Sequence, residues 1–365
     1  MSKAGNGLLP IGVLGLLSAG GTWHACQAAE LNMYGVGHLS FDGIDTGVSS
    51  SDYVHSNSSR LGIKGNQDLD NGLSIYIQYE SGVDLTVHGT GDGNGGANSA
   101  GQIFTRARDS FVGLKSDFGS IQAGRVGGMN QWLYDYNPFA DQVGDLGNLW
   151  GGDGLPGRID NALEYISPTV SGFKVAVIYV PNEGGYNQYD EVVKADYALG
   201  GLKVGVGYGR FGAGGVGLPS LEGTAVTASY EAAIFSVGGE YQHEKNVGAF
   251  TGADRDQFTF GATMKLGTSA VLKAQYTWSG ELSGVPQSGA RQIAAGLDYN
   301  LGTSTTVYLA YAHMSNSANA AFSSFDYGHG DQGAPPILAG KSPAAYSIGL
   351  IYKFDLSIFK GMSRS

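Results

Sequence analysis

The sequence lacks three features that many protein classes need. Cys26 is its only cysteine, only 15% of its 365 residues are charged, and outside the first thirty residues no apolar run reaches the length of a membrane helix. A lone cysteine excludes a disulfide framework. A share of 42% hydrophobic residues is nevertheless too high for a disordered chain. Glycine (61), tyrosine (21) and phenylalanine (15) are abundant instead, and this composition suits strands and tight turns.

The first 29 residues are predicted to be a secretory signal peptide. Lys3 provides the positive start, an apolar segment follows over 8–19, and small residues surround the expected cleavage near Ala28 or Ala29. That cleavage removes Cys26, so no disulfide and no catalytic thiol would remain after export. A membrane anchor and a lipoprotein signal at Cys26 are the alternatives, and the short apolar run argues against the anchor.

Acidic residues outnumber basic ones. Removing Lys3 with the signal peptide leaves 20 basic and 32 acidic residues, a net charge of −12. Nucleic-acid binding requires a basic surface, so no nucleic-acid partner is expected.

Most of the remaining sequence alternates between apolar and polar residues. Leu272, Ala274, Tyr276 and Trp278, for example, alternate with lysine, glutamine and threonine. A period of two is typical of a half-buried strand. A soluble β-sandwich, a solenoid or a small packed barrel would also show it. The strands are long, however, their second face carries ionisable residues, and aromatic residues recur near their ends, which together favour a membrane barrel.

Connections between the expected strands alternate in length. Short turns are expected at 68–72, 116–119, 167–172, 199–201, 266–268 and 301–303, and long loops near 42–56, 85–100, 127–157, 183–190, 212–221, 247–255, 282–290 and 316–342. Eight long loops imply sixteen strands, and the 336 residues of 30–365 then leave 21 for each strand with its connection. The predicted fold class is therefore all-β: a transmembrane antiparallel β-barrel of 16 strands with short periplasmic turns, long extracellular loops and an aqueous lumen.

One connection, 127–157, stands out by its length. It is rich in glycine, aspartate, asparagine and aromatic residues and shows no strand or helix period. Unstructured loops of this length inside compact domains are usually functional. We expect this loop to fold into the lumen and to narrow the pore.

Two segments resemble a known family. SSRLGIKGNQDLDNGLSIYIQYES (58–81) and RARDSFVGLKSDFGSIQAGR (106–125) are similar to the general trimeric porins of Gram-negative outer membranes, above all those of Neisseria and related betaproteobacteria. YISPTVSGFKVAVIY (165–179) and the terminal aromatic strand add weaker matches. The resemblance implies sixteen antiparallel strands, a homotrimer and an inward-folded third loop.

The expected organisation is a signal peptide (1–29), a barrel (30–354) with its inward loop (127–157), and a C-terminal tail (355–365). Such porins usually end on an aromatic residue of the last strand. Phe354 fits that position, and the alternative is that Phe359 closes the strand.

Strand parity places basic residues on the inner wall. Leu61 and Ile63 are expected to face lipid, which turns Arg60 and Lys64 inward. On the segment 106–125, an outward Phe111 would likewise turn the residues that alternate with it towards the lumen.

Those residues are Arg106, Arg108 and Ser110. The resemblance matches Arg60 and Arg108 to wall arginines of the porin constriction. Arg158, just after the loop, is a looser third match. The candidate basic wall is Arg60, Lys64, Arg106, Arg108 and Arg158.

Acidic residues of the loop are expected to face this wall. Charges of opposite sign across a narrow pore create a transverse field that favours polar solutes. As alternatives, the arginines form structural pairs with a neighbour such as Asp109, and the loop aspartates are solvated turn residues. The candidate loop acids are Asp135, Asp141, Asp145 and Asp153.

The sequence predicts an outer-membrane porin that forms a water-filled pore for passive diffusion of small hydrophilic solutes and ions, with a slight preference for cations. A substrate-selective outer-membrane channel is the first alternative, and a surface adhesin or structural barrel is the second. A barrel enzyme is a remote third, because no catalytic motif is present, so the protein is not expected to be an enzyme.

No cofactor and no metal are expected. The seven histidines show no close ligand pairing, and His243 is expected in an aromatic belt. Expected partners are further copies of the chain in a homotrimer, outer-membrane lipid and lipopolysaccharide, and the solutes and ions that pass.

Overall fold

The computed structural model describes residues 30–86, 106–129, 136–150, 155–182, 189–213, 215–325, 329 and 336–359. The predicted signal peptide lies outside the described residues, as do Asp135, Asp153 and the last six residues of the chain.

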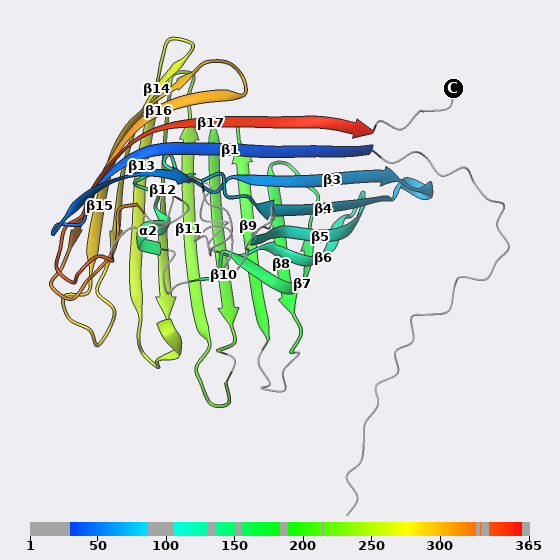
Figure 1. Ribbon diagram of the computed structural model, residues 1–365. Coiled ribbons are helices and arrows are strands. Elements are labelled where there is room, and N and C mark those ends of the chain that lie inside the picture. The colour runs from blue at the N-terminus through cyan, green and yellow to red at the C-terminus, as the bar shows by residue number, and fades with distance from the viewer. Residues whose placement is uncertain are drawn as a thin grey trace, which may run out of the picture.

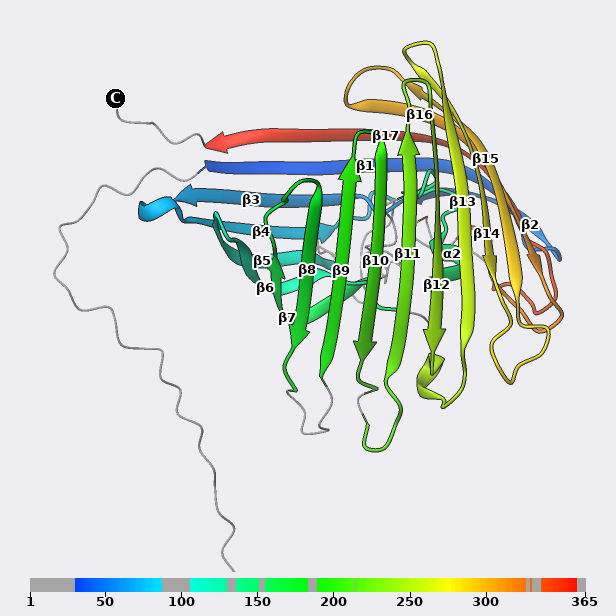
Figure 2. The ribbon, with the colours of Figure 1, turned by 180° about the vertical axis from the view of Figure 1, so that it is seen from behind.

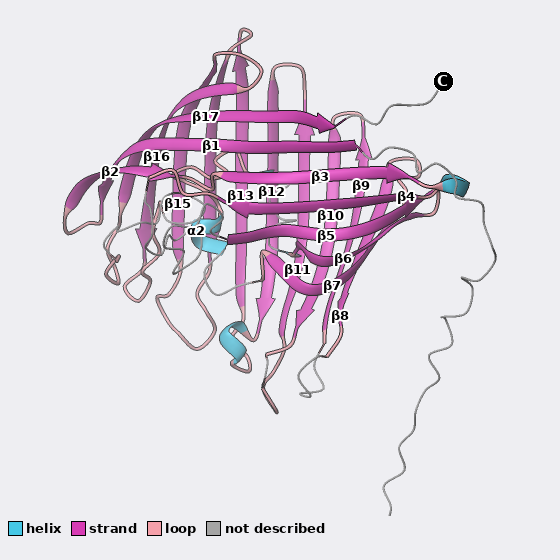
Figure 3. Cartoon of the chain, turned by 45° about the vertical axis from the view of Figure 1, so that its right-hand side comes forward, coloured by secondary structure: helices cyan, strands magenta, loops and turns pink. Residues whose placement is uncertain are grey.

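Nearly all regular structure in the described residues is β-strand (Figure 3). The first strands are β1 (Glu30–Asp45), β2 (Ser50–Ser56), β3 (Arg60–Asp68), β4 (Ser74–Gly82), β5 (Arg106–Ser116), β6 (Gly119–Gly127), β7 (Arg158–Ile166), β8 (Phe173–Val180) and β9 (Asp190–Leu199). They are followed by β10 (Leu202–Phe211), β11 (Leu221–Glu231), β12 (Phe235–Lys245), β13 (Arg255–Leu266), β14 (Ala270–Ser279), β15 (Ala290–Asn300), β16 (Thr305–Asn316) and β17 (Ala344–Phe359).

These strands form one closed antiparallel sheet. β1 pairs along its whole length with β17, and the two lie side by side in Figure 1, while Figure 2 shows the middle strands following one another around the far wall. On its other edge β1 pairs with β2 over 39–45 and with β3 over 30–36, so β2 and β3 are two halves of one barrel strand. The interruption lies at 57–59, where Ser58 has a positive φ of 46°. The predicted sixteen-stranded barrel is confirmed.

The connections follow the predicted alternation with two differences. The expected long loop at 42–56 is wrong, because β1 continues to Asp45 and β2 begins at Ser50. Strand-forming residues on both sides, such as Phe41 and Val54, pair directly and leave a four-residue turn. A short turn at 232–234, between β11 and β12, was not among the expected ones.

The two faces of the sheet differ as the alternation predicts. On β13, Phe258 and Phe260 are exposed on the outer face, whereas Gln257 and Thr259 are buried on the inner face. Similar rows of exposed large apolar side chains occur on the other strands. Soluble monomers rarely expose contiguous apolar patches of more than roughly a few hundred Å², so this outer surface fits a lipid environment. Among the described residues, no helix is both long and apolar enough to cross a membrane.

The last strand is longer than expected. β17 continues to Phe359, which pairs with Leu31 of β1. The alternative end of the barrel is therefore the observed one, and the boundary at 354 is five residues too early. Phe354 pairs with Gly35 inside the strand instead of ending it.

We predict that Leu309→Arg destabilises the barrel by about 2–4 kcal/mol, because an arginine near the middle of a membrane-facing strand must leave water. Leu309 is exposed on β16. Leu301→Arg is the matched control, since Leu301 is exposed in a short turn and its arginine would stay hydrated. Urea unfolding in lipid vesicles measures both. Equal effects would contradict the membrane-facing assignment of this surface.

Candidate functional site

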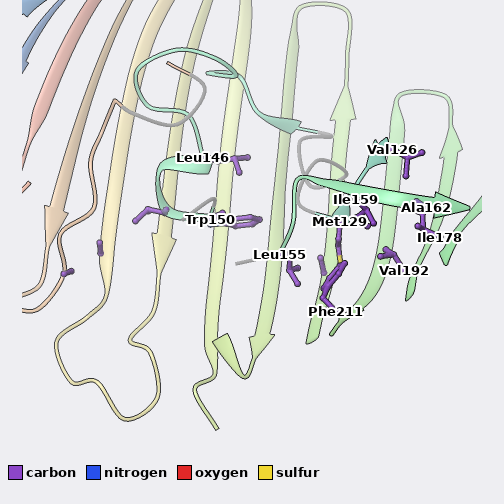
Figure 4. Close-up of a cluster of buried hydrophobic side chains, with 14 of the residues drawn as sticks. Val126, Met129, Leu146, Trp150, Leu155, Ile159, Ala162, Ile178, Val192 and Phe211 are labelled. Carbon is purple, nitrogen blue, oxygen red and sulfur yellow. The ribbon is translucent and has the colours of Figure 1, made fainter. Parts of the chain in front are cut away.

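The described part of the long connection between β6 and β7 packs against the inner face of the barrel. Its described part includes the short helix α2 (Gly147–Trp150), and Phe139, Leu146, Leu149 and Trp150 are completely buried. Figure 4 shows Leu146, Trp150 and Leu155 of this connection beside the wall. Two apolar clusters join the loop to residues of the strands, one towards β6–β11 and one towards β15–β17. Burial of these side chains fixes the loop against the wall.

Three glutamines on adjacent strands bind the loop backbone. Gln257 of β13 donates from Nε2 to the carbonyl oxygen of Leu149 at 3.0 Å. Gln275 of β14 and Gln292 of β15 both donate to the carbonyl oxygen of Gly144, at 3.2 and 2.9 Å. Buried carbonyl groups must find a donor. The glutamines supply it, so the polar residues that alternate with exposed apolar ones on these strands hold the loop.

Lys273 of β14 reinforces the same attachment. Its Nζ lies 2.6 Å from Oε1 of Gln142 and 3.1 Å from the carbonyl oxygen of Pro138. It also forms an ion pair with Asp298 of β15 at 2.8 Å. A buried ammonium group needs such partners, so this lysine is a structural contact of the loop.

Two glycines of the wall provide the space that loop side chains occupy. A Cβ at Gly238 would lie 2.4 Å from Cγ of Tyr136, and a Cβ at Gly223 would lie 2.3 Å from Cδ1 of Leu155. Tyr136 is held at this place by its hydroxyl, 2.8 Å from Oγ of Ser236. Wall and loop therefore fit each other only because these positions carry no side chain.

Asp145 organises the loop itself. The carboxylate is completely buried and accepts hydrogen bonds from the backbone N–H of Asp141 and Gly147 and from Nδ2 of Asn137, at 2.8, 2.8 and 2.9 Å. Burial outweighs these three bonds and raises the pKa of Asp145 to about 7. The expectation that Asp145 faces the pore is thus wrong, because its side chain turns into the loop.

Asp141 is the loop acid that meets the wall. Its Oδ2 lies 3.3 Å from Nη1 of Arg60, and both side chains remain partly accessible. Arg60 also donates to the carbonyl oxygen of Ser58, in the interruption between β2 and β3, at 3.0 Å. This ion pair connects the loop with the wall formed by β3.

Two further arginines of the candidate basic wall pair with carboxylates of neighbouring strands. Nε of Arg108 lies 2.5 Å from Oε1 of Glu80, and Nε of Arg158 lies 2.6 Å from Oδ1 of Asp109. All four side chains are between 10% and 23% exposed. Together with Arg60 and Asp141, three positive charges face three negative ones, so the wall alternates in sign instead of being uniformly basic.

A β-bulge explains the direction of Arg108. The pairing of β4 and β5 shifts between Tyr79 and Ser81, so that Glu80 opposes both Arg108 and Asp109. The shift reverses the parity beyond it. Phe111 consequently packs inward, edge-to-face with Tyr76, at 6.1 Å between ring centroids.

Ser110 accordingly shares the outer face with Tyr79, its partner across the strands. The expectation of an outward Phe111 with an inward Ser110 is wrong, although Arg108 does face the lumen. Arg106 pairs with Gly82 in the backbone register.

Lys64 lies away from this group. Its Nζ is 3.3 Å from Oδ2 of Asp355 and 4.7 Å from the centre of the Tyr34 ring, and its side chain is about half exposed. It belongs to the end of the barrel that carries the short turns. Of the proposed loop acids, Asp135 and Asp153 lie outside the described residues.

Sequence reasoning missed the residues that hold the loop. Gln257, Gln275 and Gln292 carry the main polar contacts. The sequence feature that could have indicated them is the recurrence of glutamine at inward positions of three consecutive strands. A wall that faced only water would not require neutral amide groups at these positions.

Three comparisons with known proteins agree with one another. A family model described as Gram-negative porin matches residues 16–319. The major outer membrane protein P.IB of Neisseria gonorrhoeae is 26% identical over 279 residues, 74% of this chain and 69% of that protein. The chitoporin of Vibrio furnissii is 30% identical over 152 residues, so the match spans only 39% of that relative's length. The solved anion-selective porin from Comamonas acidovorans has a TM-score of 0.75 at 21% identity, covering 90% of this chain and 100% of that one, which is a likeness of fold.

We predict that Gly238→Ala loosens the loop, because the new methyl group collides with the ring of Tyr136. Overpacking of this kind costs about 1–3 kcal/mol. Gly302→Ala is the control, since nothing lies within 4 Å of the Cβ that it adds. Urea unfolding and single-channel conductance compare the two. An equal and small effect in both variants would show that Tyr136 is not held in this place.

The buried carboxyl group of Asp145 predicts a pH dependence. Its pKa of about 7 in the folded protein exceeds the ordinary value of 3.8, so the folded state retains a proton that the unfolded state releases. The free energy of unfolding should therefore fall as the pH rises from about 4 to about 7, and this contribution should level off at higher pH. Asp145→Asn cannot ionise, so unfolding curves at several pH values should lack this slope. An unchanged slope in the variant would assign the pH dependence to other groups.

Proposed function

The chain belongs to the Gram-negative porin family of outer-membrane barrels, and from this premise we propose that it forms a water-filled pore for passive diffusion of small hydrophilic solutes and ions. The homologous porins are channels and not enzymes. No energy source or cofactor is part of the proposal.

The observation that carries the proposal is the group of partly accessible charges inside the barrel. Arg60, Asp141, Arg108 and Glu80 all retain some exposure although the sheet surrounds them. A dry, filled interior would make ionised side chains very costly. Their accessibility supports a lumen that contains water at the level of the loop.

We place the narrowest part of the passage between the loop and the wall of β3–β7. The loop limits the size of the solute, and the pairing of Arg60 with Asp141 sets charges of opposite sign on the two sides. Such an arrangement orients polar solutes and disfavours apolar ones.

The proposed ion preference is weakly cationic. Each described arginine of the wall is compensated by a carboxylate, and the chain without Lys3 has a net charge of −12. The porin from Comamonas acidovorans is named as anion-selective, so the opposite preference is the outcome that would overturn this part of the proposal.

We further propose that the protein is a homotrimer embedded in outer-membrane lipid and lipopolysaccharide, after removal of residues 1–29. The family resemblance supports the trimer. Chemical cross-linking of the folded protein, followed by electrophoresis, would test it, and a monomer under all conditions would contradict it.

A substrate-selective channel is the second candidate function. The relative from Vibrio furnissii is named a chitoporin, which directs attention to oligosaccharides as a class. A selective channel would show saturable flux and blockade by one solute at low concentration, whereas a general porin would show neither.

Single-channel recording in a planar bilayer with a KCl gradient tests the pore. We predict large ohmic steps for the wild type. Arg60→Ala with Arg108→Ala leaves Asp141 and Glu80 without their partners, so the preference for cations should rise by at least roughly fivefold, since a single uncompensated charge about 4 Å from a passing cation is worth about 1 kcal/mol in water.

Lys245→Ala with Arg291→Ala is the matched control. It removes the same charge from the membrane-side face of β12 and β15, away from the lumen. The control should leave the ion preference unchanged. Absence of conductance in folded, heat-modifiable barrels would overturn the porin proposal and favour an adhesin or structural barrel.

A further inference from the structure

Three side chains that lie far apart in the sequence meet beside the constriction. Asp42 of β1, His55 of β2 and His329, in the connection between β16 and β17, each offer a ligand atom, and these atoms all lie within 4.8 Å of one another. Nδ1 of His55 is 2.7 Å from Oδ2 of Asp42, and Nε2 of His329 is 3.1 Å from the same oxygen. The absence of close ligand pairing in the sequence is compatible with this group, because strand pairing and loop closure bring together residues without any local spacing.

The group is buried and incompletely hydrogen-bonded. The side chains of Asp42 and His329 have no exposed area, and that of His55 has 2%. Oδ1 of Asp42 and Nε2 of His55 lack a hydrogen-bond partner among the described residues. Buried polar atoms are rarely left unpaired, and such atoms often mark a place for an ion or another ligand.

The surroundings of His329 and Asp42 orient these two residues as metal ligands are oriented. Nδ1 of His329 lies 3.4 Å from the carbonyl oxygen of Asp141, so an Nδ1–H tautomer would leave the lone pair of Nε2 directed at Asp42. Asp42 in turn accepts a hydrogen bond from Oγ of Ser40 at 2.8 Å. Metal-binding histidines typically donate their second ring N–H to a carbonyl or carboxylate group, and ligating carboxylates are themselves hydrogen-bonded.

From this geometry we propose that Asp42, His55 and His329 form a binding site for a divalent transition metal of the Zn²⁺ class. Two imidazoles and one carboxylate are a donor set that such ions prefer, and a solvent molecule would complete a tetrahedron. Bonds of roughly 2.0–2.2 Å separate neighbouring ligand atoms by roughly 3.3 Å. The two printed neighbours of Oδ2 of Asp42 lie at 2.7 and 3.1 Å, slightly closer than that value, so small outward movements of the two imidazoles would admit the ion.

The site would connect the last long loop with the wall and the constriction. His329 is the ligand from the loop at 317–343, Asp42 and His55 come from the wall, and Asp141 next to His329 is the residue that pairs with Arg60. A bound ion would tie His329 to the wall and stiffen the surroundings of Asp141. The effect on conductance rests on the proposed pore function, whereas the binding itself does not.

Metal titration of the folded protein tests the site. We use untagged protein in detergent micelles, because a polyhistidine tag would bind the metal itself, and measure Zn²⁺ by calorimetry and Co²⁺ by its visible absorption. We expect one ion per chain and intense tetrahedral Co²⁺ bands. Removal of a supporting partner lowers metal affinity about 10–100-fold, so loss of a direct ligand in His329→Ala or His55→Ala should lower it by at least roughly 100-fold.

His243→Ala is the matched control. His243 also lies beside an aspartate, with Nδ1 2.7 Å from Oδ1 of Asp256, but the pair is partly exposed and has no third ligand among the described residues. The His243→Ala variant should therefore bind metal with the same affinity as the wild type. Heat-modifiable migration in electrophoresis confirms that each variant is folded, and His329→Ala changes a loop residue, so it leaves the strands intact.

The opposite result overturns the site. If wild type, His329→Ala and His55→Ala bind Zn²⁺ and Co²⁺ equally, or none binds either ion, the three residues are a hydrogen-bonded cluster only. In a second measurement, micromolar Zn²⁺ should lengthen closed states of wild-type channels and not of His329→Ala channels. Binding without any conductance would leave the metal site standing and contradict the pore, so the two failures are distinguishable.

Discussion

Closure of the sheet between β1 and β17 is the constraint on which the rest of the structure depends. In hydrocarbon, every backbone N–H and C=O must be paired within the protein, and a closed barrel is the only sheet without unpaired edges. The interrupted strand of β2 and β3 keeps this closure by sharing β1 between its two halves. Once the ring is closed, apolar residues must face outward and polar residues must face a lumen, which in turn determines what the inner surface can bind.

The inner surface shows how an aqueous channel and a packed core coexist. Along β12–β16 the wall behaves as a protein interior, with amide side chains such as Gln257 and Gln292 bonded to loop carbonyls and with Gly238 leaving space for an aromatic ring. Along β3–β7 it behaves as a surface, with partly accessible ion pairs such as that of Arg108 and Glu80. The loop lies between these two environments. The carboxylate of its residue Asp145 bonds only to other groups of the loop and does not face the passage.

The architecture was predictable from the sequence because each strand repeats the same contrast between lipid and lumen. Strand number, the inward loop and the inward direction of Arg60 and Arg108 all follow from that alternation together with the family resemblance, which the family match confirms. Parity fails where the backbone gains a residue, so the bulge at Arg108 and Asp109 reversed Phe111. The roles of Asp141 and Asp145 depend on how an irregular loop folds, and the meeting of His55 with His329 depends on long-range contacts. No local pattern encodes either.

The interactions that attach the loop differ in salt sensitivity from the charges of the wall, so selection of solutes by size and selection by charge depend on different interactions. The loop is held by apolar burial, by buried amide-to-carbonyl bonds and by the fit of Tyr136 over Gly238, interactions that dissolved salt hardly weakens. The ion pairs of the wall are partly accessible to solvent, where mobile ions screen charges beyond roughly 8 Å at physiological ionic strength. In the proposed pore, salt would therefore weaken the selection of solutes by charge and leave the selection by size unchanged.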